Sequence, residues 1–451
     1  MRKLFLSTAA AALLIAGAAS AQNVSVQSGQ VNRAAQNATV RIDAPFVGAV
    51  LTGNGAAIGN IYEVDGFNVT EVGSNNGGQG ALQTNSGDQT SGLSSISTTG
   101  TSIDLSSTTA GNAVNLDGVE VRNTGSRRLN QLNESSVQSS GLTITNNRAG
   151  IFEGTSAALG NTVSANGSAS VALGGGGAGG ELLQTNNGRQ IANLSVSNGN
   201  LGEATLIGQA AGNAVSAEAP SVNLGSGTTQ TNTSFQSVTA NVNGTSALTL
   251  NVSGAALGNT ISAAGGSSSV GASQANSASQ TSLVQVGASL AVGNLNASSA
   301  TVGNAISFNN TGAVSMPGGS QTNYGVGSAT LNLTNNTANQ ANGSAQSMGN
   351  LMSLGAGDNV AVGTPQFNHA SQTASLTSNF GTVNGAASFN SLAGGNFLSV
   401  ESTGMVEGIN GNMRQNNFAN QASFTTITGG SFGSLTAGAS SLGNVTSVTN
   451  R

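Results

Sequence analysis

The sequence predicts an all-β fold, an elongated β-solenoid of about nine stacked strand–turn–strand units of ~44–53 residues. Two short motifs recur nine times each, and their separation within a unit is nearly constant. The units are rich in β-branched residues and turn formers, without a sustained helical period. Constant internal spacing with variable gaps indicates a structural repeat, in which each unit buries apolar surface against its neighbours.

The first motif is Gln-x-Asn-x-x-x-Gln. Seven copies are complete, whereas the copy at Gln131 has its second glutamine one place late, at Gln138, and the copy at Gln321 has Gly327 there. The complete copies supply the candidate ladder residues Gln30, Asn32, Gln36, Gln83, Asn85, Gln89, Gln184, Asn186, Gln190, Gln230, Asn232, Gln236, Gln274, Asn276, Gln280, Gln366, Asn368, Gln372, Gln415, Asn417 and Gln421.

A primary amide carries both hydrogen-bond donors and an acceptor, so equivalent amides in successive rungs can bond to one another along the stack. Charged residues could not replace them, because like charges would lie directly above each other. We therefore expect these side chains to form structural ladders and to have no catalytic role.

The second motif is Gly-Asn followed by an apolar-rich segment. Each of its asparagines follows the leading glutamine of its unit by 29 or 30 residues. Glycine and asparagine both tolerate a positive φ, so we expect tight corners at this motif. The candidate corner residues are Asn60, Asn112, Asn161, Asn213, Asn259, Asn304, Asn350, Asn396 and Asn444.

Alternation within a unit predicts short strands. Leu248, Leu250 and Val252 alternate with polar residues, and turn signals flank this segment at Asn243-Gly244 and Ser253-Gly254. Strands of roughly 5–6 residues would give each unit about two rungs. At ~4.8 Å per rung, nine such units would span on the order of 85 Å.

Residues 1–21 are predicted to be a secretory signal peptide, and residues 22–451 the nine-unit array. Arg2 and Lys3 precede an apolar segment that ends in small residues at Ala19-Ser20-Ala21. After cleavage, nine arginines would remain against sixteen acidic residues, a net charge of −7. Nucleic acid is therefore excluded as an expected partner, since phosphate binding requires a basic surface.

The segment Ala219–Gly357 contains no Asp, Glu, Lys or Arg. Charged residues normally prevent strand edges from joining other strands, so their absence favours self-association. Disorder is the alternative suggested by the Gly-, Ser- and Asn-rich composition. Low charge and the regular recurrence of Val, Leu, Ile and Phe favour an ordered repeat.

The usual signs of catalysis and cofactor binding are weak. The chain has no cysteine, and its one histidine, His369, occupies a replaceable motif position, so we expect no metal site, no cofactor and no enzymatic activity. Gly429-Gly430-Ser431-Phe432-Gly433 matches a nucleophile pattern, and Gly174, Gly176 and Gly179 match a phosphate-loop pattern. Neither has the helix that its chemistry requires, and both are interpreted as turns.

The amide repeat resembles the curlin repeat, most clearly at Asn276-Ser277-Ala278-Ser279-Gln280 and at Asn417-Phe418-Ala419-Asn420-Gln421. The charge-poor, signal-bearing chain is most similar to the holdfast attachment protein D type of holdfast anchor in stalked bacteria. That resemblance implies export through a curli-type outer-membrane secretion pore and assembly with itself or related repeat proteins at the cell surface. It also implies attachment of an adhesive polysaccharide to the envelope.

We therefore expect an exported, outer-membrane-associated structural and adhesive protein, a curli-like functional amyloid that self-assembles or stacks. The alternative is a monomeric β-solenoid that binds polysaccharide or ice through a flat face. A polysaccharide lyase and an autotransporter passenger are further alternatives, although groove-forming charged clusters and carboxy-terminal barrel strands are not evident. The sequence leaves open the bound material, the export partner, and whether the final state is polymer or monomer.

Overall fold

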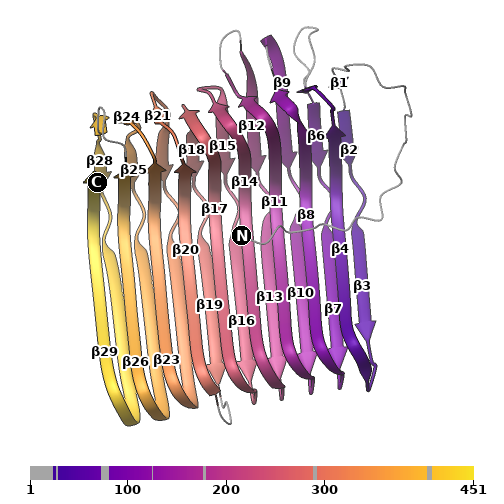
Figure 1. The fold of residues 1–451 in the computed structure, drawn as a ribbon, viewed down its shortest axis with the longest axis vertical. Coiled ribbons are helices and arrows are strands. Elements are labelled where there is room, and N and C mark those ends of the chain that lie inside the picture. The colour runs from indigo at the N-terminus through magenta and orange to yellow at the C-terminus, as the bar shows by residue number, and fades with distance from the viewer. Residues whose placement is uncertain are drawn as a thin grey trace.

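The computed structural model describes residues 24–26, 29–72, 81–123, 125–175, 179–287, 292–403 and 409–450. Within these residues the regular elements are all β-strands, and every inter-strand pairing that joins them is parallel. Figure 1 shows the strands lying side by side in chain order, from indigo to yellow. The predicted all-β solenoid is confirmed. The predicted signal peptide, residues 1–21, lies outside the described residues.

Each repeat forms one coil of the solenoid. Gln30 pairs with Gln83 and Gln83 with Gln131, and the same register continues to the pair Gln366 and Gln415. The expected two rungs per unit were wrong, because a single turn uses longer strands than the 5–6 residues assumed. Nine coils, numbered here 1 to 9 by their leading glutamines, therefore extend roughly 40 Å at ~4.8 Å per coil, about half the expected length.

A coil consists of a short strand, a second strand and a long bent strand. The short strands form a nine-stranded sheet. They are β2 (Gly29–Asn32), β6 (Ala81–Asn85), β9 (Gly125–Asn133), β12 (Gly179–Asn186), β15 (Thr228–Asn232), β18 (Ser273–Asn276), β22 (Ser320–Asn323), β25 (Gln366–Asn368) and β28 (Gln415–Asn417).

All other strands belong to a twenty-stranded sheet. The second strands are β3 (Gln36–Ile42), β7 (Gln89–Ile96), β10 (Val137–Thr145), β13 (Arg189–Ser197), β16 (Gln236–Asn243) and β19 (Gln280–Gly287). The long strands are β4 (Val47–Asp65), β8 (Thr99–Arg122), β11 (Arg148–Leu173), β14 (Asn200–Leu224), β17 (Ser246–Val270) and β20 (Val292–Asn310). In coils 7–9 the two are continuous, as β23 (Gly327–Ala356), β26 (Gln372–Ser402) and β29 (Gln421–Asn450). Short strands β1 (Val24–Val26), β5 (Val69–Val72), β21 (Val314–Met316), β24 (Val360–Val362) and β27 (Ile409–Gly411) complete the sheet.

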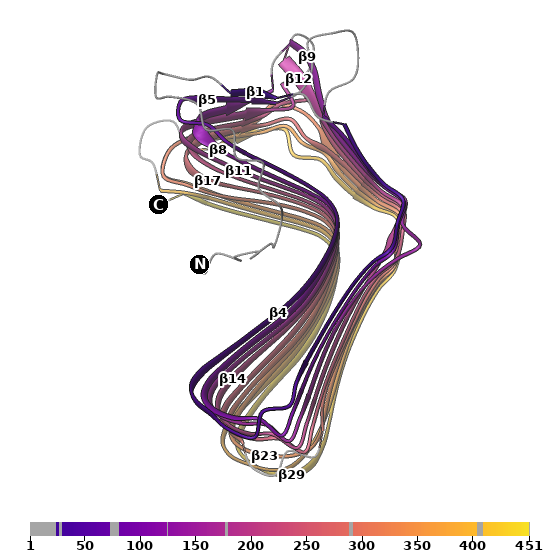
Figure 2. The same ribbon diagram turned by 90° about the vertical axis from the view of Figure 1, so that its right-hand side faces the viewer.

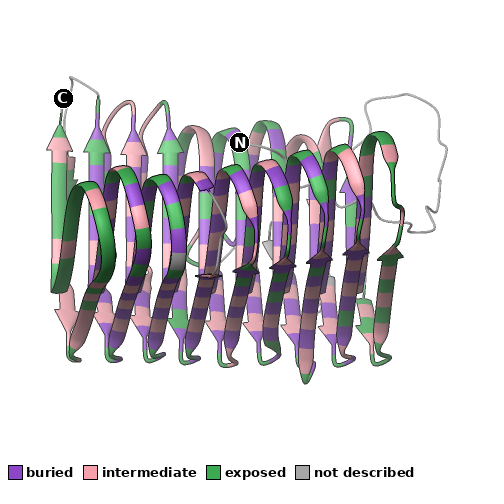
Figure 3. Cartoon of the chain, turned by 90° about the horizontal axis from the view of Figure 1, so that it is seen from below, coloured by how far each residue is buried: buried purple, intermediate pink, exposed green. Residues whose placement is uncertain are grey.

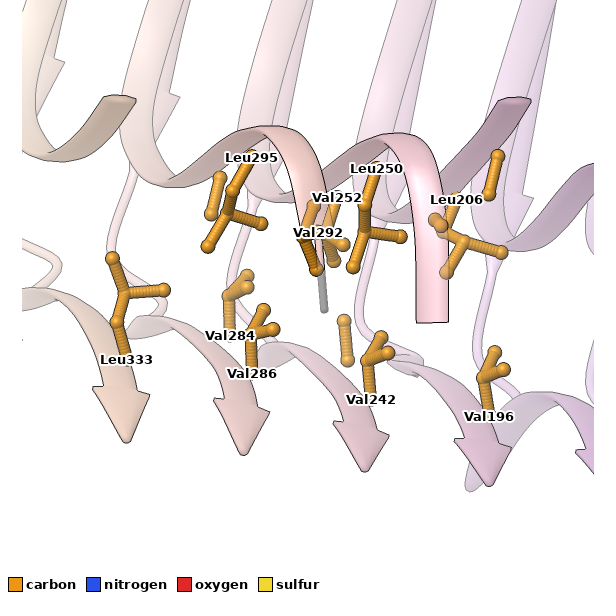
Figure 4. Packing of buried hydrophobic residues seen from close by; sticks show 14 of the residues in the cluster. Val196, Leu206, Val242, Leu250, Val252, Val284, Val286, Val292, Leu295 and Leu333 are labelled. Carbon is orange, nitrogen blue, oxygen red and sulfur yellow. The ribbon is translucent and has the colours of Figure 1, made fainter. Parts of the chain in front are cut away.

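The cross-section has two lobes that meet at a narrow waist, as Figure 2 shows. The lower lobe contains one apolar core, in which Leu206, Leu250 and Leu295 of the long strands face Val242 and Val284 of the second strands (Figure 4). The upper lobe contains the other core, which includes Ile261, Ile306 and Leu129. Alternation of side chains along each strand places one face of every strand inside these cores.

The outermost coils are far less buried than the inner ones (Figure 3). At the coil 9 end Leu435 and Val448 are 45% and 50% exposed, whereas the equivalent Ala387 and Val400 of coil 8 are 2% and 1% exposed. At the coil 1 end Leu51 is only partly buried, whereas the equivalent Ile103 of coil 2 is 0% exposed. Inner coils are covered by a neighbour on both sides, whereas coils 1 and 9 have a neighbour on one side only. Within the residues described, the chain forms no helix of the length and apolarity needed to cross a membrane.

Candidate functional site

The waist is filled by columns of primary amides. In the first column, the Nε2 of each leading glutamine donates to the Oε1 of the glutamine in the preceding coil, from Gln83 to Gln30 through to Gln415 to Gln366, at 2.7–2.9 Å. The inner members are buried; Gln230 and Gln321 are 0% exposed. These bonds link all nine coils in one continuous line.

The asparagines two residues later form the second column. Here each Nδ2 donates to the Oδ1 of the following coil, from Asn32 to Asn85 through to Asn368 to Asn417, at 2.6–2.9 Å. The direction of donation is therefore opposite to that of the first column. Because each amide uses both its donor and its acceptor, its polar atoms keep hydrogen-bond partners although they are buried away from water.

The Gly-Asn motif supplies a third column from the opposite wall of the waist. Its asparagines bond in series from Asn60 to Asn112 through to Asn396 to Asn444, at 2.7–2.9 Å. The expectation of corners with positive φ at these asparagines was wrong: they lie inside strands, and among the described residues the non-glycine positions with positive φ are Ser97, Asn146 and Asn198.

The glycine of this motif is needed for close approach. A Cβ at Gly258 would overlap the Oδ1 of Asn276 and the carbonyl oxygen of Gly303, and seven equivalent glycines meet the same two kinds of atom. The walls of the waist are thus too close for any side chain at this position. The recurrence of Gly before Asn therefore reflects the lack of space beside the amide columns and not a turn of the chain.

Hydrogen bonds across the waist explain the constant spacing of 29 or 30 residues. Each leading glutamine also donates to the carbonyl after the Gly-Asn asparagine of its own coil, as Gln230 does to Thr260 at 2.9 Å. In return, Asn213 donates to the carbonyl of Thr231 in the next coil at 2.8 Å. The path between these residues runs around the lower lobe and has a fixed length, whereas the return path around the upper lobe takes 15–23 residues.

The second glutamine of the first motif forms a fourth column that is interrupted. Bonds run in series from Gln36 through Gln89, Gln138, Gln190 and Gln236 to Gln280. Gly327 then offers no amide.

The expected ladder role of Gln372 and Gln421 was therefore wrong. Gln372 instead donates to the carbonyl of Gly325 and accepts from Ser347. The Oε1 of Gln421 accepts the backbone N–H of Gln372, so no amide-to-amide bond joins the two side chains.

The incomplete motif copies are nonetheless members of the columns. Gln131, Asn133, Gln321 and Asn323 occupy their places in the first two columns, and Gln138 joins the fourth despite its displacement by one residue. These residues were absent from the sequence-based set because the whole motif was required. Alignment by the 29–30 residue spacing would have identified them.

A shallow groove of about 380 Å³ crosses the outer face of the lower lobe. One side is a row of stacked polar residues in which Asn342 donates to Asn296, and Asn296 to Asn251, at 2.9 Å each. A second row, two residues further along each strand, includes Ser253, Ser298 and Ser344 in the same coils. The residues of both rows lie in the charge-free segment, so the groove offers neutral hydrogen-bonding groups at intervals of ~4.8 Å.

Titratable groups do not gather into a catalytic cluster. Among the described residues, no three acidic, His or Cys side chains could jointly hold a metal ion. The His369 ring lies in a surface stack between the rings of Tyr324 and Phe418, with centroid distances of 4.6 and 4.7 Å. Burial raises the pKa of the Tyr62 hydroxyl in coil 1 from 10.0 to about 12. The segment Gly429–Gly433 lies within strand β29, without the strand-to-helix turn of a hydrolase nucleophile.

Comparison with known protein families gives a match. Residues 2–248, more than half of the chain, match the family described as Holdfast attachment protein D. The chain belongs to the Holdfast attachment protein D family. This family has a role in holdfast attachment and so associates with the cell surface, in keeping with the resemblance noted from the amide repeats. Neither a curated protein nor a solved structure matches the chain.

Proposed function

We propose that this member of the Holdfast attachment protein D family is an exported, non-enzymatic structural protein that anchors adhesive polysaccharide to the cell envelope at the outer membrane. The observation that carries the proposal is the line of buried amide columns through all nine coils. Such a core makes a stiff rod suited to transmitting load between an attachment surface and the cell. Family membership supports the holdfast as the attached structure.

The groove is the surface that suits a polysaccharide best. Sugar hydroxyls both donate and accept, as do the side-chain amides of Asn251, Asn296 and Asn342. These residues repeat along the rod axis, so an extended polymer could make the same contact in successive coils. Ice binding, the alternative, is less favoured here because the corresponding row contains Asp104 and Glu153 in the earlier coils instead of a run of threonines.

Export and assembly complete the proposal. Residues 1–21 would direct export, and a curli-type outer-membrane pore would pass the chain to the surface, where it would stack with copies of itself or with related repeat proteins. The charge-free Ala219–Gly357 segment supports passage and stacking in an amyloid-like state. Parallel coils at ~4.8 Å spacing are also the basic arrangement of cross-β structure.

The experiment is a binding assay with purified holdfast polysaccharide and the mature protein, together with a deletion strain. We expect co-sedimentation with the polysaccharide, and loss of the holdfast from cells that lack the protein. Replacing Asn251, Asn296 and Asn342 with alanine should weaken binding about tenfold or more, since several hydrogen bonds to a neutral ligand are lost together.

The matched control replaces Ser262, Ser307 and Ser353, a polar row on the same three coils outside the groove. This variant should bind normally. Retained holdfast attachment in the deletion strain would refute the anchoring function. Equal binding of polysaccharide by both triple variants would refute the groove as the binding surface.

A further inference from the structure

We propose that copies of this chain stack head to tail, with coil 1 of one copy on coil 9 of the next, and that the amide columns select this polarity. The inference rests on the proposed structural function, and it specifies how the rods are joined. Four features of the two end coils carry it: exposed apolar surface, strand register, hydrogen-bonding polarity and an aromatic–arginine contact.

Both end coils expose side chains that the inner coils bury. On coil 9, Leu435 and Val448 are 45% and 50% exposed, whereas the equivalent Ala387 and Val400 of coil 8 are 2% and 1% exposed. On coil 1, Val40 and Leu51 are only partly buried, whereas the equivalent Leu93 and Ile103 of coil 2 are 2% and 0% exposed. Terminal repeats of solenoids usually carry a polar outer face that prevents further stacking. In the part of the chain that the structure describes, neither end coil is capped in this way, so a further coil on each would bury apolar surface and pair open strand edges.

The strands at the two ends correspond in position around the coil. Strand β1 pairs with β5, and the register continues from β5 through one strand of each coil to β24 and β27, so β1 and β27 occupy the same place in the cross-section. By the same register, β2 corresponds to β28, and β3 and β4 to the two parts of β29. A copy placed head to tail would therefore continue every ladder in parallel, without a change of strand direction.

The amide columns present complementary groups at the two ends. At the coil 1 end, Asn32 and Asn60 face outward with the Oδ1 acceptor that accepts in every later coil, and Gln30 with the Nε2 donor. At the coil 9 end, Asn417 and Asn444 each keep one Nδ2 hydrogen to donate. The Oε1 of Gln415 accepts from the Thr446 hydroxyl at 3.0 Å and can accept a second hydrogen bond. Head-to-tail contact matches all three columns. Head-to-head contact would turn one copy over, so its strands would meet those of the other copy antiparallel and the three columns would not continue.

The surface position after the motif asparagine adds a specific contact. In coils 7 to 9 it holds the stacked rings of Tyr324, His369 and Phe418, and the outer face of Phe418 is open. In coil 1 the same position holds Arg33. Stacking head to tail would place this guanidinium over the Phe418 ring as a cation–π pair. The chain already contains such a contact between adjacent coils, with Arg189 5.9 Å from the centroid of Phe235.

The polarity is tested by single cysteines, because the chain has none of its own. Val31 and Asn416 occupy the same column, one at each end. Stacked Cα atoms at ~4.8 Å fall within the range that a disulfide bridges. A mixture of the Val31→Cys and Asn416→Cys variants should form mixed disulfide dimers under oxidation. Cross-linking of either variant with itself, and not with the other, would overturn the proposed polarity.

The contact is tested by light scattering and electron microscopy of the mature chain. Phe418→Ser should weaken end-to-end association by about 5- to 30-fold. The control Tyr324→Ser removes an equivalent ring two coils from the end and should leave association unchanged. The exchanged pair Arg33→Phe with Phe418→Arg should restore it. Equal effects of Phe418→Ser and Tyr324→Ser would refute the contact.

Failure of stacking and failure of anchoring can be told apart. A wild-type chain that stays monomeric at high concentration yet binds polysaccharide through the groove would overturn this inference and leave the proposed function standing. A chain that stacks but has no role in holdfast retention would refute the proposed function and leave this inference standing.

Discussion

The amide columns predict that burial, more than the number of hydrogen bonds, decides the cost of removing an asparagine. Asn276 and Asn296 lie in the same coil, and each is hydrogen-bonded to a stacked asparagine on both sides. Asn276 is fully buried at the waist, whereas Asn296 lies on the outer surface beside the groove. Replacing each with alanine therefore removes the same side chain, from a site without water at Asn276 and from a water-accessible surface at Asn296.

The magnitude follows from the atoms left behind. Asn276→Ala deprives Asn232 Nδ2 of an acceptor at 2.8 Å and Asn323 Oδ1 of a donor at 2.7 Å, and water cannot readily replace either partner. An unsatisfied buried group costs about 1–3 kcal/mol. Asn232 keeps a bond to Gln236, and Asn323 keeps one from the Gly325 N–H, so we expect a total of roughly 2–4 kcal/mol. Asn296→Ala should cost less than about 0.5 kcal/mol, because water can satisfy Asn251 and Asn342.

The assay is native-state amide hydrogen exchange, which reports local opening free energies in a repeat array. The backbone amides of coils 5 to 7 should lose protection in Asn276→Ala and keep it in Asn296→Ala. Chemical denaturation followed by circular dichroism gives a second measure. Equal loss of stability in the two variants would refute the reasoning, since it would mean that the waist has no special dependence on satisfied amides.

Three further predictions concern packing and ionisation. Gly258→Ala should destabilise coils 5 and 6 by about 1–3 kcal/mol in the same exchange experiment, because its Cβ would overlap backbone and amide oxygens, while Gly92→Ala, which has open space, should be nearly neutral. Gly327→Gln alone should not stabilise the chain, because the Oε1 of Gln372 and the hydroxyls of Ser347 and Thr301 lie where the new side chain would go. With Thr301 and Ser347 also changed to alanine, Gln372 loses its bond from Ser347, the fourth column should close and the melting temperature should rise. A rise for the single variant would contradict this explanation. Because burial raises the pKa of Tyr62 to about 12 while an unfolded tyrosine ionises near 10, its contribution is complete below pH 10 and is lost between pH 10 and 12. That loss of roughly 2–3 kcal/mol should be absent in Tyr62→Phe when unfolding is followed over this pH range.

The parts of the fold that the sequence predicted depend on one-dimensional regularity. The stacking of equivalent amides could be proposed because Gln83 and Gln131 recur at matched places, and stacked identical groups must be self-complementary. What could not be predicted was the length of a turn. A unit of 44–53 residues fits two short rungs as well as one long coil, and only the pairing of Gln30 with Gln83 distinguishes them.

The candidate site was predicted only in part for a related reason. Asn259 was interpreted as a corner because Gly-Asn commonly turns a chain, but the glycine is required by the closeness of Asn276 on the opposite wall. That closeness is a property of the closed cross-section and leaves no local signal. The interruption at Gly327 was visible in the sequence, although its compensation by Thr301 and Ser347 required the coils to be placed side by side.

The sequence by itself determined that the chain is a repeat of β-strands with columns of amides, because composition and spacing along the chain suffice to specify which residues are equivalent. Only the tertiary structure decided that the amides lie at a waist between two apolar cores, and that the two ends of the rod are complementary. Those properties arise when residues about 30 positions apart meet across the coil, and such contacts depend on how the chain closes upon itself.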